Sequence, residues 1–295
     1  MGTRRTWSVG ICMFMAAPVS GQVGQSGGSI TRVDHFFAES ASASALLDFL
    51  MTQFELPEAW PYRAYGPFES GGVDVGNVTL EVVRFEDSAE LGSGRFSGIA
   101  LEPEGDTESA LDWLTERGVE HRTPEPFPPE DPVWENTTLP TLIPSNVSVV
   151  FICDYKNRSL VLEGQQAGRA LLAERNGGPL GILGVRDLVI ESTDMARSRA
   201  DWSRLLPQTR SAGDDVLIEF DQGPRIRIHR GDTDRFAGIV LTVRSIDEAR
   251  AFLEERELVG PSIDGALSID PQAVGGLRIL ITQAASTPHG APPGG

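Results

Sequence analysis

The sequence predicts an α+β protein with two homologous domains, because one strand-and-helix unit occurs in it twice. Residues 95–101 (RFSGIAL) return almost unchanged as residues 235–241 (RFAGIVL). Each copy leads into an acidic turn and a segment with apolar residues at helical spacing, 106–119 in the first and 245–259 in the second. A period of about 140 residues is too long for a solenoid, whose repeats run about 20 to 50 residues. The repeat therefore indicates two domains in tandem.

The length and charge of the chain limit the partners it can bind. A chain of 295 residues is long enough for two domains with separate cores. Its formal net charge of −17 repels the phosphates of nucleic acids and anionic lipid surfaces. Lys156 is the only lysine, so Schiff-base chemistry at any other position is excluded. We therefore expect a small-molecule substrate or ligand, and neither nucleic acid nor membrane as a partner.

Residues 1–29 have the layout of a signal peptide followed by a linker. Arg4 and Arg5 precede an apolar run at 9–19, and a small, polar region follows. This run is too short to cross a bilayer as a helix, which needs about 20 residues. The pattern predicts a periplasmic or secreted protein; if the segment is instead an uncleaved tail, the protein is cytoplasmic. At the other end, residues 286–295 are rich in Pro and Gly and are predicted to be disordered.

The first domain is predicted at 30–165 and contains two modules, each a strand and a helix followed by further strands. The predicted elements of the first module are a strand at 30–38, a helix at 40–54, a bent arm at 61–75 and a strand at 76–85. The second module has the repeated strand and helix, a proline-rich loop at 123–132 and a buried strand at 147–155.

A linker is predicted at 166–180, and a second domain at 181–285 repeats the pattern. Its predicted elements are a strand at 184–191, a helix at 193–206, strands at 216–220 and 225–229, the repeated strand and helix, and strands at 266–269 and 277–281. The second domain is therefore the shorter of the two.

Three segments, in their order and spacing, resemble the vicinal oxygen chelate (VOC) superfamily. They are Val33-Asp34-His35-Phe36, Gly76-Asn77-Val78-Thr79-Leu80-Glu81 and Gly98-Ile99-Ala100, the last followed by an acidic helix. This superfamily contains glyoxalase I, extradiol dioxygenases and bleomycin-resistance proteins. The resemblance covers residues 30–285 and implies tandem glyoxalase-like domains, each of paired βαβββ modules forming a curved sheet around a cleft.

The resemblance also implies metal ligands on the strands that line the first cleft. Carried over position by position, they fall on His35, Glu81 and Asp154, while a further histidine position falls on Phe96, which cannot bind a metal. Imidazole and carboxylate together suit a divalent metal such as Fe, Mn, Zn or Ni. Glu81 is in addition the candidate catalytic base.

Each of these residues also has a structural interpretation. A single histidine in an apolar strand, as His35 is, more often belongs to the core than to a metal site. Asp154 could be a turn residue that ends its strand. Glu81 is the stronger candidate, because a carboxylate among apolar neighbours is seldom buried without a partner.

The second domain is expected to bind no metal. Alignment of the two halves puts Asp187 at the position of His35 and Ile228 at the position of Glu81, and Phe236 again replaces a histidine. Apolar side chains should therefore fill this site, whereas the first domain should have an open cleft. The loss of donors also argues against an extradiol dioxygenase, whose iron site would be expected in this half.

Other residues give weaker signals. Cys153 follows apolar residues in a strand and is expected to be an inert, buried thiol. His121 is expected to face solvent. An aromatic cluster precedes the strand predicted at 76–85, and we expect it to be a hydrophobic plug over the cleft in preference to a ligand-facing wall. Its members are Trp60, Tyr62, Tyr65 and Phe68.

The sequence leaves two functions open. The first is a metal-dependent lyase, isomerase or oxygenase that acts on a small oxygenated compound through a metal at His35 and Glu81. The second is a metal-free protein that sequesters an apolar or aromatic ligand in the same cleft, as resistance-type members of the superfamily do.

Overall fold

The computed structural model describes residues 29–263 and 265–284. Nearly all of the predicted signal segment and the whole predicted C-terminal tail lie outside these ranges, so both stay predictions. Within the described ranges, no helix is long and apolar enough to cross a membrane.

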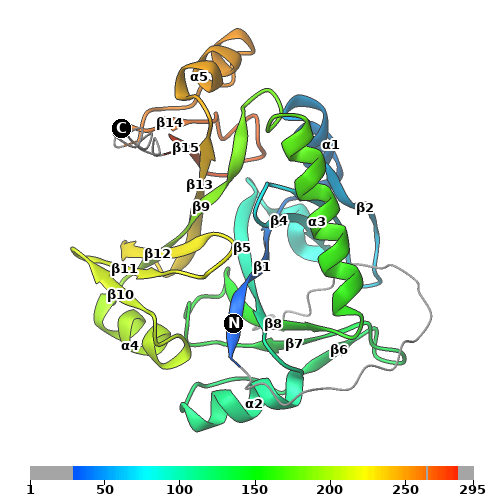
Figure 1. The fold of residues 1–295 in the computed structure, drawn as a ribbon, viewed down its shortest axis with the longest axis vertical. Helices are drawn as coiled ribbons and strands as arrows, with labels where there is room; N and C mark the ends of the chain where they lie inside the picture. The colour runs from blue at the N-terminus through cyan, green and yellow to red at the C-terminus, as the bar shows by residue number, and fades with distance from the viewer. Residues whose placement is uncertain (1–28, 264, 285–295) are drawn as a thin grey trace, which may run out of the picture.

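Eight strands form the first sheet, in the order β2-β3-β4-β1-β5-β8-β7-β6. They are β1 (Ile30–Glu39), β2 (Glu58–Ala64), β3 (Phe68–Asp74), β4 (Thr79–Phe85), β5 (Arg95–Pro103), β6 (Glu125–Phe127), β7 (Trp134–Thr138) and β8 (Val149–Tyr155). Helices α1 (Ala43–Gln53) and α2 (Thr107–Glu116) and a short 3-10 helix (Glu86–Glu90) lie between them in sequence. The chain order gives two βαβββ modules, β1-α1-β2-β3-β4 and β5-α2-β6-β7-β8 (Figure 1).

Seven strands form the second sheet, in the order β10-β11-β12-β9-β13-β15-β14. They are β9 (Ile182–Ser192), β10 (Arg210–Ala212), β11 (Asp215–Ile218), β12 (Arg225–Arg230), β13 (Arg235–Val243), β14 (Leu267–Ser268) and β15 (Ile279–Gln283), with helices α4 (Met195–Leu205) and α5 (Ile246–Glu255). The last module has β14 and β15 after its helix, and Val259 and Ile269 add only an isolated bridge. The predicted α+β fold of tandem paired modules is confirmed.

The two repeated segments occupy equivalent strands. β5 lies between antiparallel β1 and parallel β8, and β13 lies between antiparallel β9 and parallel β15. Ala100 pairs with His35, and the corresponding residue of the second copy, Val240, pairs with Asp187. The two halves are thus related strand by strand, as the repeat predicted.

Side-chain caps determine where three of the helices begin. Asp106, Asp194 and Ser245 each accept a hydrogen bond from the backbone N–H three residues further along the chain. Such a cap satisfies one of the N–H groups that the first turn of a helix leaves without an internal partner. Each cap closely follows the end of a strand, so α2, α4 and α5 fold back directly from β5, β9 and β13.

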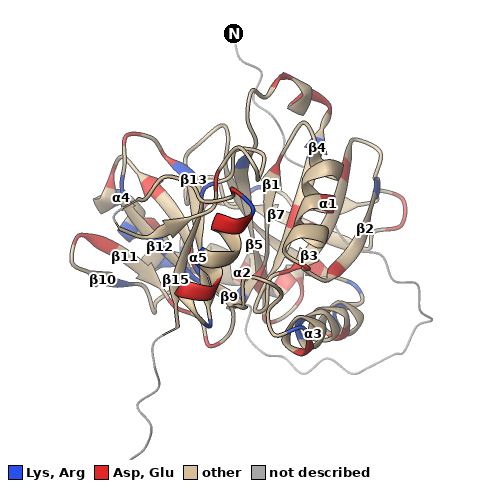
Figure 2. Ribbon diagram, turned by 90° about the horizontal axis from the view of Figure 1, so that it is seen from above, with Lys and Arg blue, Asp and Glu red and all other residues tan. Residues whose placement is uncertain are grey.

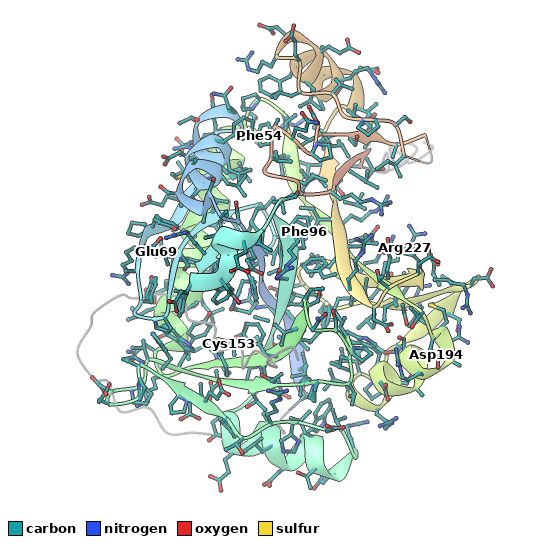
Figure 3. All side chains as sticks on the ribbon, turned by 180° about the vertical axis from the view of Figure 1, so that it is seen from behind. Phe54, Glu69, Phe96, Cys153, Asp194 and Arg227 are labelled. Carbon is teal, nitrogen blue, oxygen red and sulfur yellow. The ribbon has the colours of Figure 1, made fainter. Side chains whose placement is uncertain are left out.

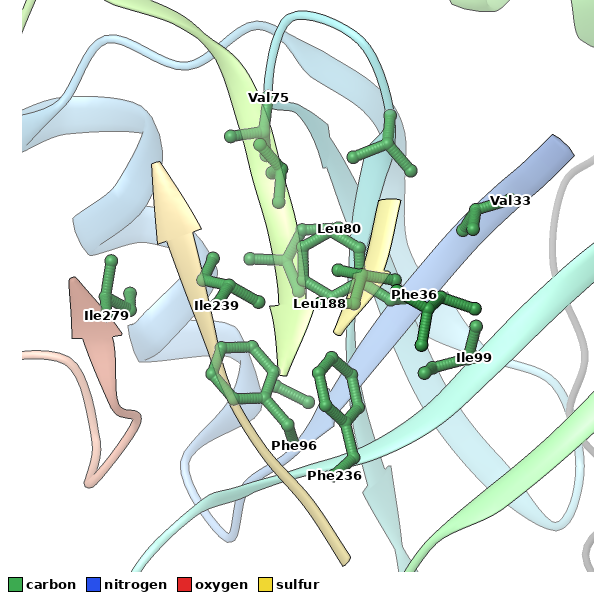
Figure 4. Close-up of a cluster of buried hydrophobic side chains, with 14 of the residues drawn as sticks. Val33, Phe36, Val75, Leu80, Phe96, Ile99, Leu188, Phe236, Ile239 and Ile279 are labelled. Atoms are coloured by element: carbon green, nitrogen blue, oxygen red, sulfur yellow. The ribbon is translucent and has the colours of Figure 1, made fainter. Parts of the chain in front are cut away.

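The outer faces of the two sheets contribute to one continuous hydrophobic core. Phe36 of β1, Phe96 of β5 and Phe236 of β13 meet there (Figure 4), and Figure 3 shows Phe96 between the two halves. The ring centroids of Phe96 and Phe236 lie 5.0 Å apart, and those of Phe36 and Phe236 lie 6.1 Å apart. These are distances at which aromatic rings attract each other. The two sheets therefore stabilise each other through β5 and β13, the strands that carry the repeated sequence.

The inner face of the first sheet carries a second, aromatic cluster and is partly covered by helix α3 (Arg158–Glu174). This helix contacts β2, β3 and β8, and Figure 2 shows it apart from the other helices, beside β3. It begins directly after β8 and continues into the segment 166–180 that the sequence predicted as a linker. The candidate site lies between this helix and the sheet.

Candidate functional site

The structure brings His35 and Glu81 together on the inner face of the first sheet. β1 and β4 are parallel neighbours, and Glu81 pairs with Phe37, two residues after His35. Residues two apart on a strand point to the same face. His35 is 2% exposed and Glu81 is 0% exposed. His35 Nε2 lies 3.9 Å from Glu81 Oε2.

Three polar atoms at this place have no hydrogen-bond partner among the described residues. They are His35 Nε2 and both carboxylate oxygens of Glu81, and all three are buried. A buried polar atom without a partner costs about 1–3 kcal/mol. Native proteins keep few such atoms, so three of them facing one another call for an explanation.

Asp34 holds the imidazole ring of His35 in place. Its Oδ2 accepts hydrogen bonds from His35 Nδ1 at 2.6 Å and from the Tyr155 hydroxyl at 2.8 Å, and its Oδ1 accepts one from the Gln165 amide at 2.9 Å. Adjacent strand residues normally point to opposite faces, but the pairing of β1 with β5 is irregular between Val33 and His35, which lets Asp34 reach the ring. Because Nδ1 donates to Asp34, Nε2 is the ring nitrogen left for a ligand.

The two carboxyl groups of the site have opposite pKa shifts. Burial alone would raise the pKa of Asp34, but the hydrogen bond and attraction of His35, together with the charge of Arg32, lower it to about 2. Burial raises the pKa of Glu81 well above its usual value; the Ser70 hydroxyl opposes this rise and the charge of Asp34 adds to it. Asp34 is therefore ionised at neutral pH, whereas the surroundings of Glu81 favour its protonated form.

A small, largely enclosed cavity lies beside His35, between the sheet and α3. Its volume is about 30 Å³, room for one or two water molecules. His35 and Thr79 are at its polar end, and Trp60 and Val161 belong to its apolar wall. Glu81 lies next to His35 but does not line the cavity. The prediction of an open cleft in this half is therefore wrong, because α3 covers the face that the sequence left open.

Asp154 does not join this site. Phe151 and Cys153 of the same strand point into the inner cluster, so Asp154 points to the other face of the sheet. Its Oδ2 accepts hydrogen bonds from the backbone N–H and hydroxyl of Thr107 at 2.8 and 3.0 Å, and its Oδ1 accepts one from Arg158 at 3.0 Å. Asp154 thus ties β8 to the first turn of α2, and the structure does not support its assignment as a ligand beside His35 and Glu81.

Strand pairing shows which residues of the second module lie opposite the site. His35 pairs with Ala100 and Phe37 pairs with Gly98. A side chain at Gly98 would collide with the ring of Phe37. The second module therefore provides no histidine at this position, and an aromatic ring of the first module fills the space.

A phenylalanine lies on the other side of β5. Phe151 of β8 pairs with Ala100. Phe151 is buried and its ring lies edge-on to His35, with centroids 5.8 Å apart. The sequence-based assignment of a missing ligand to Phe96 is wrong, because Phe96 points into the core between the two sheets.

In the second sheet, the residue at the position of Glu81 is one place earlier in the sequence than the residue that was predicted. Asp187 stands at the position of His35, as predicted. The counterpart of Glu81 is Arg227, which pairs with Val189, two residues after Asp187. Ile228, the residue predicted there, points into the core between the sheets.

Ion pairs occupy the place in the second sheet where apolar side chains were predicted. Asp187 is fully buried and is bound by the guanidinium groups of Arg225 and Arg186. An open hollow of about 490 Å³ lies beside these arginines. Phe236, which was expected to fill the space, belongs to the core between the sheets. The predicted contrast between an open first site and a filled second site is therefore wrong.

The remaining candidate residues have structural roles. Cys153 is buried in the inner cluster, as expected. Trp60 and Phe68 are also buried, which supports the plug interpretation, although Trp60 forms part of the cavity wall as well. The indole N–H of Trp60 donates to the Ser70 hydroxyl at 3.4 Å. His121 is half-buried, with Nδ1 3.1 Å from the carbonyl oxygen of Val119, and so faces solvent only in part.

His35 and Glu81 offer a metal two donors, not a full set. Among the described residues, no group of three or more His, Cys, Asp or Glu side chains could hold a metal ion. Two donors that each lie about 2.0–2.2 Å from a metal are about 3.3–3.6 Å apart at the tetrahedral angle. The separation of 3.9 Å between His35 Nε2 and Glu81 Oε2 is a few tenths of an ångström longer. The two side chains would therefore have to close slightly around a divalent cation, and positions would be left over for other oxygens.

Comparison with known proteins establishes the fold. No protein-family model and no curated protein matches the sequence. A 2,3-dioxygenase from a Pseudomonas species superposes with a TM-score of 0.59 over 90% of this chain and 96% of its own, at 11% identity. Homoprotocatechuate 2,3-dioxygenase from Arthrobacter globiformis gives 0.54 over 88% and 81%, at 10% identity. A hypothetical protein from Staphylococcus aureus gives 0.56 over 85% and 98%, at 11% identity. The chain thus has the fold of these dioxygenases, and identities this low carry no statement about activity.

Proposed function

We propose that the protein is a metal-dependent enzyme, a lyase, isomerase or oxygenase, which acts on a small oxygenated molecule at His35 and Glu81. One observation carries the proposal. His35 Nε2 and both oxygens of Glu81 face one another, buried and without partners among the described residues. A divalent cation between them would provide all three atoms with a partner. When bound, such an ion supplies Lewis-acid activation of substrate oxygens.

The residues of the chain have separate tasks in this proposal. Asp34 orients His35 so that Nε2 faces the site. Glu81, whose pKa burial raises well above its usual value, is the member of the pair suited to carry and transfer a proton. Trp60 and α3 keep bulk water away from the pair. Opposite pKa shifts of two neighbouring carboxyl groups, as in Asp34 and Glu81, are typical of sites that move protons.

Metal binding by His35→Ala tests the proposal directly. Protein freed of metal with a chelator is titrated with Mn²⁺, Fe²⁺, Zn²⁺ and Ni²⁺, and we expect one bound ion per chain. Loss of a residue that only orients a metal ligand typically weakens metal binding by about 10–100-fold. His35→Ala should weaken it by more than this, because the variant loses one of the two protein donors. His121→Ala and Asp154→Asn remove a histidine and a carboxylate outside the site and should leave the affinity unchanged. Wild-type protein that takes up no ion would refute the proposal.

Asp34→Asn should weaken metal binding by about 10–100-fold, because the neutral amide no longer fixes the ring of His35 through a charged hydrogen bond. Glu102→Gln is the matched control. Glu102 is a second buried carboxylate of the same half, and it binds Arg32 at 2.5 Å. Thermal unfolding is measured on both variants, so that a loss of stability is separated from a loss of affinity. Equal metal affinities in the two variants would contradict the positioning role of Asp34.

A metal-free binding protein is the second candidate function. The observation that favours it is that the strands of the second module bring Gly98 and Phe151 near the site, and among the described residues no third donor joins His35 and Glu81. In that case the unpartnered atoms of His35 and Glu81 would meet polar groups of the ligand itself. Ligand binding by wild-type protein that takes up no divalent ion would support this candidate.

A further inference from the structure

The open hollow of the second half lies where the two halves meet, and it shares no lining residue with the cavity beside His35. Its volume is about 490 Å³. Positions 183–186 of β9, positions between 219 and 225 and Asn77 of the first half line it. The Asn77 amide donates to the Val185 carbonyl oxygen and accepts from the Val185 N–H, both at 2.8 Å. The wall that joins the two halves is therefore fixed by backbone contacts.

A buried carboxylate orients two guanidinium groups at this hollow. Asp187 is 0% exposed, and it accepts hydrogen bonds from Arg225 Nε at Oδ1 and from Arg186 Nε at Oδ2, the latter at 2.9 Å. Both arginines line the hollow, and their side chains are 29% and 40% exposed. A guanidinium group has five N–H donors, and Asp187 takes only one from each arginine. The terminal nitrogens of both are thus held at the hollow with donors to spare.

The charges around the hollow favour an anion. Glu219 is the one carboxylate among the described residues that line it. Arg210 already binds this carboxylate through two hydrogen bonds, at 2.8 and 3.1 Å. The nearest terminal nitrogen of Arg225 lies 3.8 Å from Glu219, too far for a hydrogen bond. The three arginines therefore exceed their two carboxylate partners, Asp187 and Glu219, by one positive charge, in a chain whose net charge is −17.

Apolar side chains line another part of the hollow. Leu183 is 48% exposed, the most exposed large apolar side chain among the described residues. Phe220 is partly buried and lies on the same wall system. A ligand with a short apolar body would cover Leu183 while its charged end meets the arginines. Binding sites for small molecules commonly combine apolar walls with a few such polar groups.

We propose that this hollow binds a small organic carboxylate. The terminal nitrogens of Arg186 and Arg225 hold the carboxylate, and the apolar body lies against Leu183 and Phe220. A guanidinium group suits this ligand, because its N–H groups match the geometry of the two carboxylate oxygens. The site is separate from His35 and Glu81 and requires no metal ion, so the inference does not rest on the proposed function.

Binding of benzoate and benzyl alcohol at pH 7 tests this proposal, because the two probes have similar size and differ in charge. Protein freed of metal with a chelator is titrated with each probe, and binding is followed by calorimetry or by the NMR signals of the probe. We expect one benzoate per chain, and benzyl alcohol should bind at least about 10-fold more weakly, since it brings no charge to the arginines. Added salt should weaken benzoate binding. Equal affinities for the two probes, or no binding of benzoate, would overturn the inference.

Variants of exposed residues locate the bound probe. Leu183→Glu places a negative charge at the hollow and should weaken benzoate binding at least about 10-fold, whereas the uncharged Leu183→Gln should weaken it less. Leu171→Glu, which changes another exposed leucine, is the matched control and should leave the affinity unchanged. Arg186→Gln should weaken binding at least about 10-fold. Glu219→Gln, which removes the carboxylate that lines the hollow, should strengthen it about 3-fold or more.

His35→Ala separates this site from the first one and should leave benzoate binding unchanged. Loss of benzoate binding in a His35→Ala variant that keeps the thermal stability of the wild type would place the anion at the first site and overturn the inference. So would benzoate binding that both Leu183→Glu and Arg186→Gln leave unchanged. If His35→Ala is unstable, the variants at the exposed Leu183 decide the question. Metal titration of the same samples tests the enzyme proposal separately, because benzoate binding is measured on metal-free protein.

Discussion

Phe36→Ala is expected to destabilise the protein by about 3–5 kcal/mol, the usual range for removing a large, fully buried aromatic side chain. Phe36 is 0% exposed, and its ring lies 5.9 Å from that of Phe96 and 6.1 Å from that of Phe236. One residue thus supports strands of both sheets. Urea unfolding followed by fluorescence and circular dichroism should show a lower midpoint with the slope unchanged.

The core shared by the two sheets also predicts how the variant unfolds. Because buried residues of both halves form one continuous cluster, both spectroscopic signals should change in a single transition. Phe220→Ala removes a phenylalanine that is only partly buried at the same core and should cost much less. Two separate transitions, with Phe36→Ala affecting only one, would mean that the halves fold independently.

The repeated segment and the hydrophobic periodicity predicted the duplication and most of the strands and helices, whereas the arrangement in paired βαβββ modules was implied by the resemblance to the VOC superfamily. The helix predicted at 245–259 is α5 (Ile246–Glu255), and the strand predicted at 30–38 is β1 (Ile30–Glu39). These signals are local, since a helix and a strand each place apolar residues at a characteristic spacing. The repeat then related the two halves strand by strand, because equal segments take equivalent places in a duplicated fold.

The register of the second site could not be predicted, because it depends on the length of a turn. Gly76 lies three residues before the start of β4 at Thr79, whereas Gly223 lies two residues before the start of β12 at Arg225. Aligning the two glycines therefore shifts the second strand by one residue, so that Ile228 is assigned to the position of Glu81 in place of Arg227. A shift of one residue moves every side chain of a strand to the other face.

The residues that orient His35 could not be predicted from the sequence either. Strict alternation along β1 would place Asp34 on the face of the sheet opposite to His35. Only an irregularity in the pairing of β1 with β5 allows the observed hydrogen bond between the two side chains. Gln165 comes from α3, a helix whose buried side contains Gly168 and few apolar residues. Such a helix has a weak hydrophobic pattern, so its place over the site could not be read from periodicity.

Glu81→Met is expected to stabilise the metal-free protein by about 1–3 kcal/mol at neutral pH, because it replaces two unpartnered, buried oxygens with apolar atoms of similar volume. The wild-type carboxyl is 0% exposed and its oxygens have no partner among the described residues. A side chain that lowers stability in this way is typical of functional sites, where a ligand later supplies the missing contact. The same variant should lose metal binding.

The pH dependence of stability gives this prediction a second, independent measurement. Burial raises the pKa of Glu81 in the folded state, so between its unfolded pKa near 4.5 and the raised value the folded protein holds more protons than the unfolded one. Stability must then fall as pH rises through that window, by up to about 1.4 kcal/mol per pH unit for each such group. Other buried carboxyl groups also lower the stability as pH rises, and they do so equally in wild type and variant. They are Asp74, whose pKa is raised to about 6, and Glu102 and Asp154, whose pKa values are also raised. Asp34 acts in the opposite sense and only below about pH 4, because its pKa is lowered to about 2.

Subtracting the two stability curves isolates Glu81. Urea unfolding of metal-free wild type and Glu81→Met is measured from pH 4.5 to 8, and the gain in the free energy of unfolding should be small at pH 4.5 and grow as pH rises. Glu81→Gln is the matched control: it removes the titrating group but keeps unpartnered polar atoms, so it should flatten the pH dependence while gaining less than the methionine variant at neutral pH. A saturating divalent ion should stabilise wild type and neither variant, since both lack the carboxylate. A methionine variant less stable than wild type over the whole pH range would mean that Glu81 serves the fold, and the case for a cation between Glu81 and His35 would lose its main support.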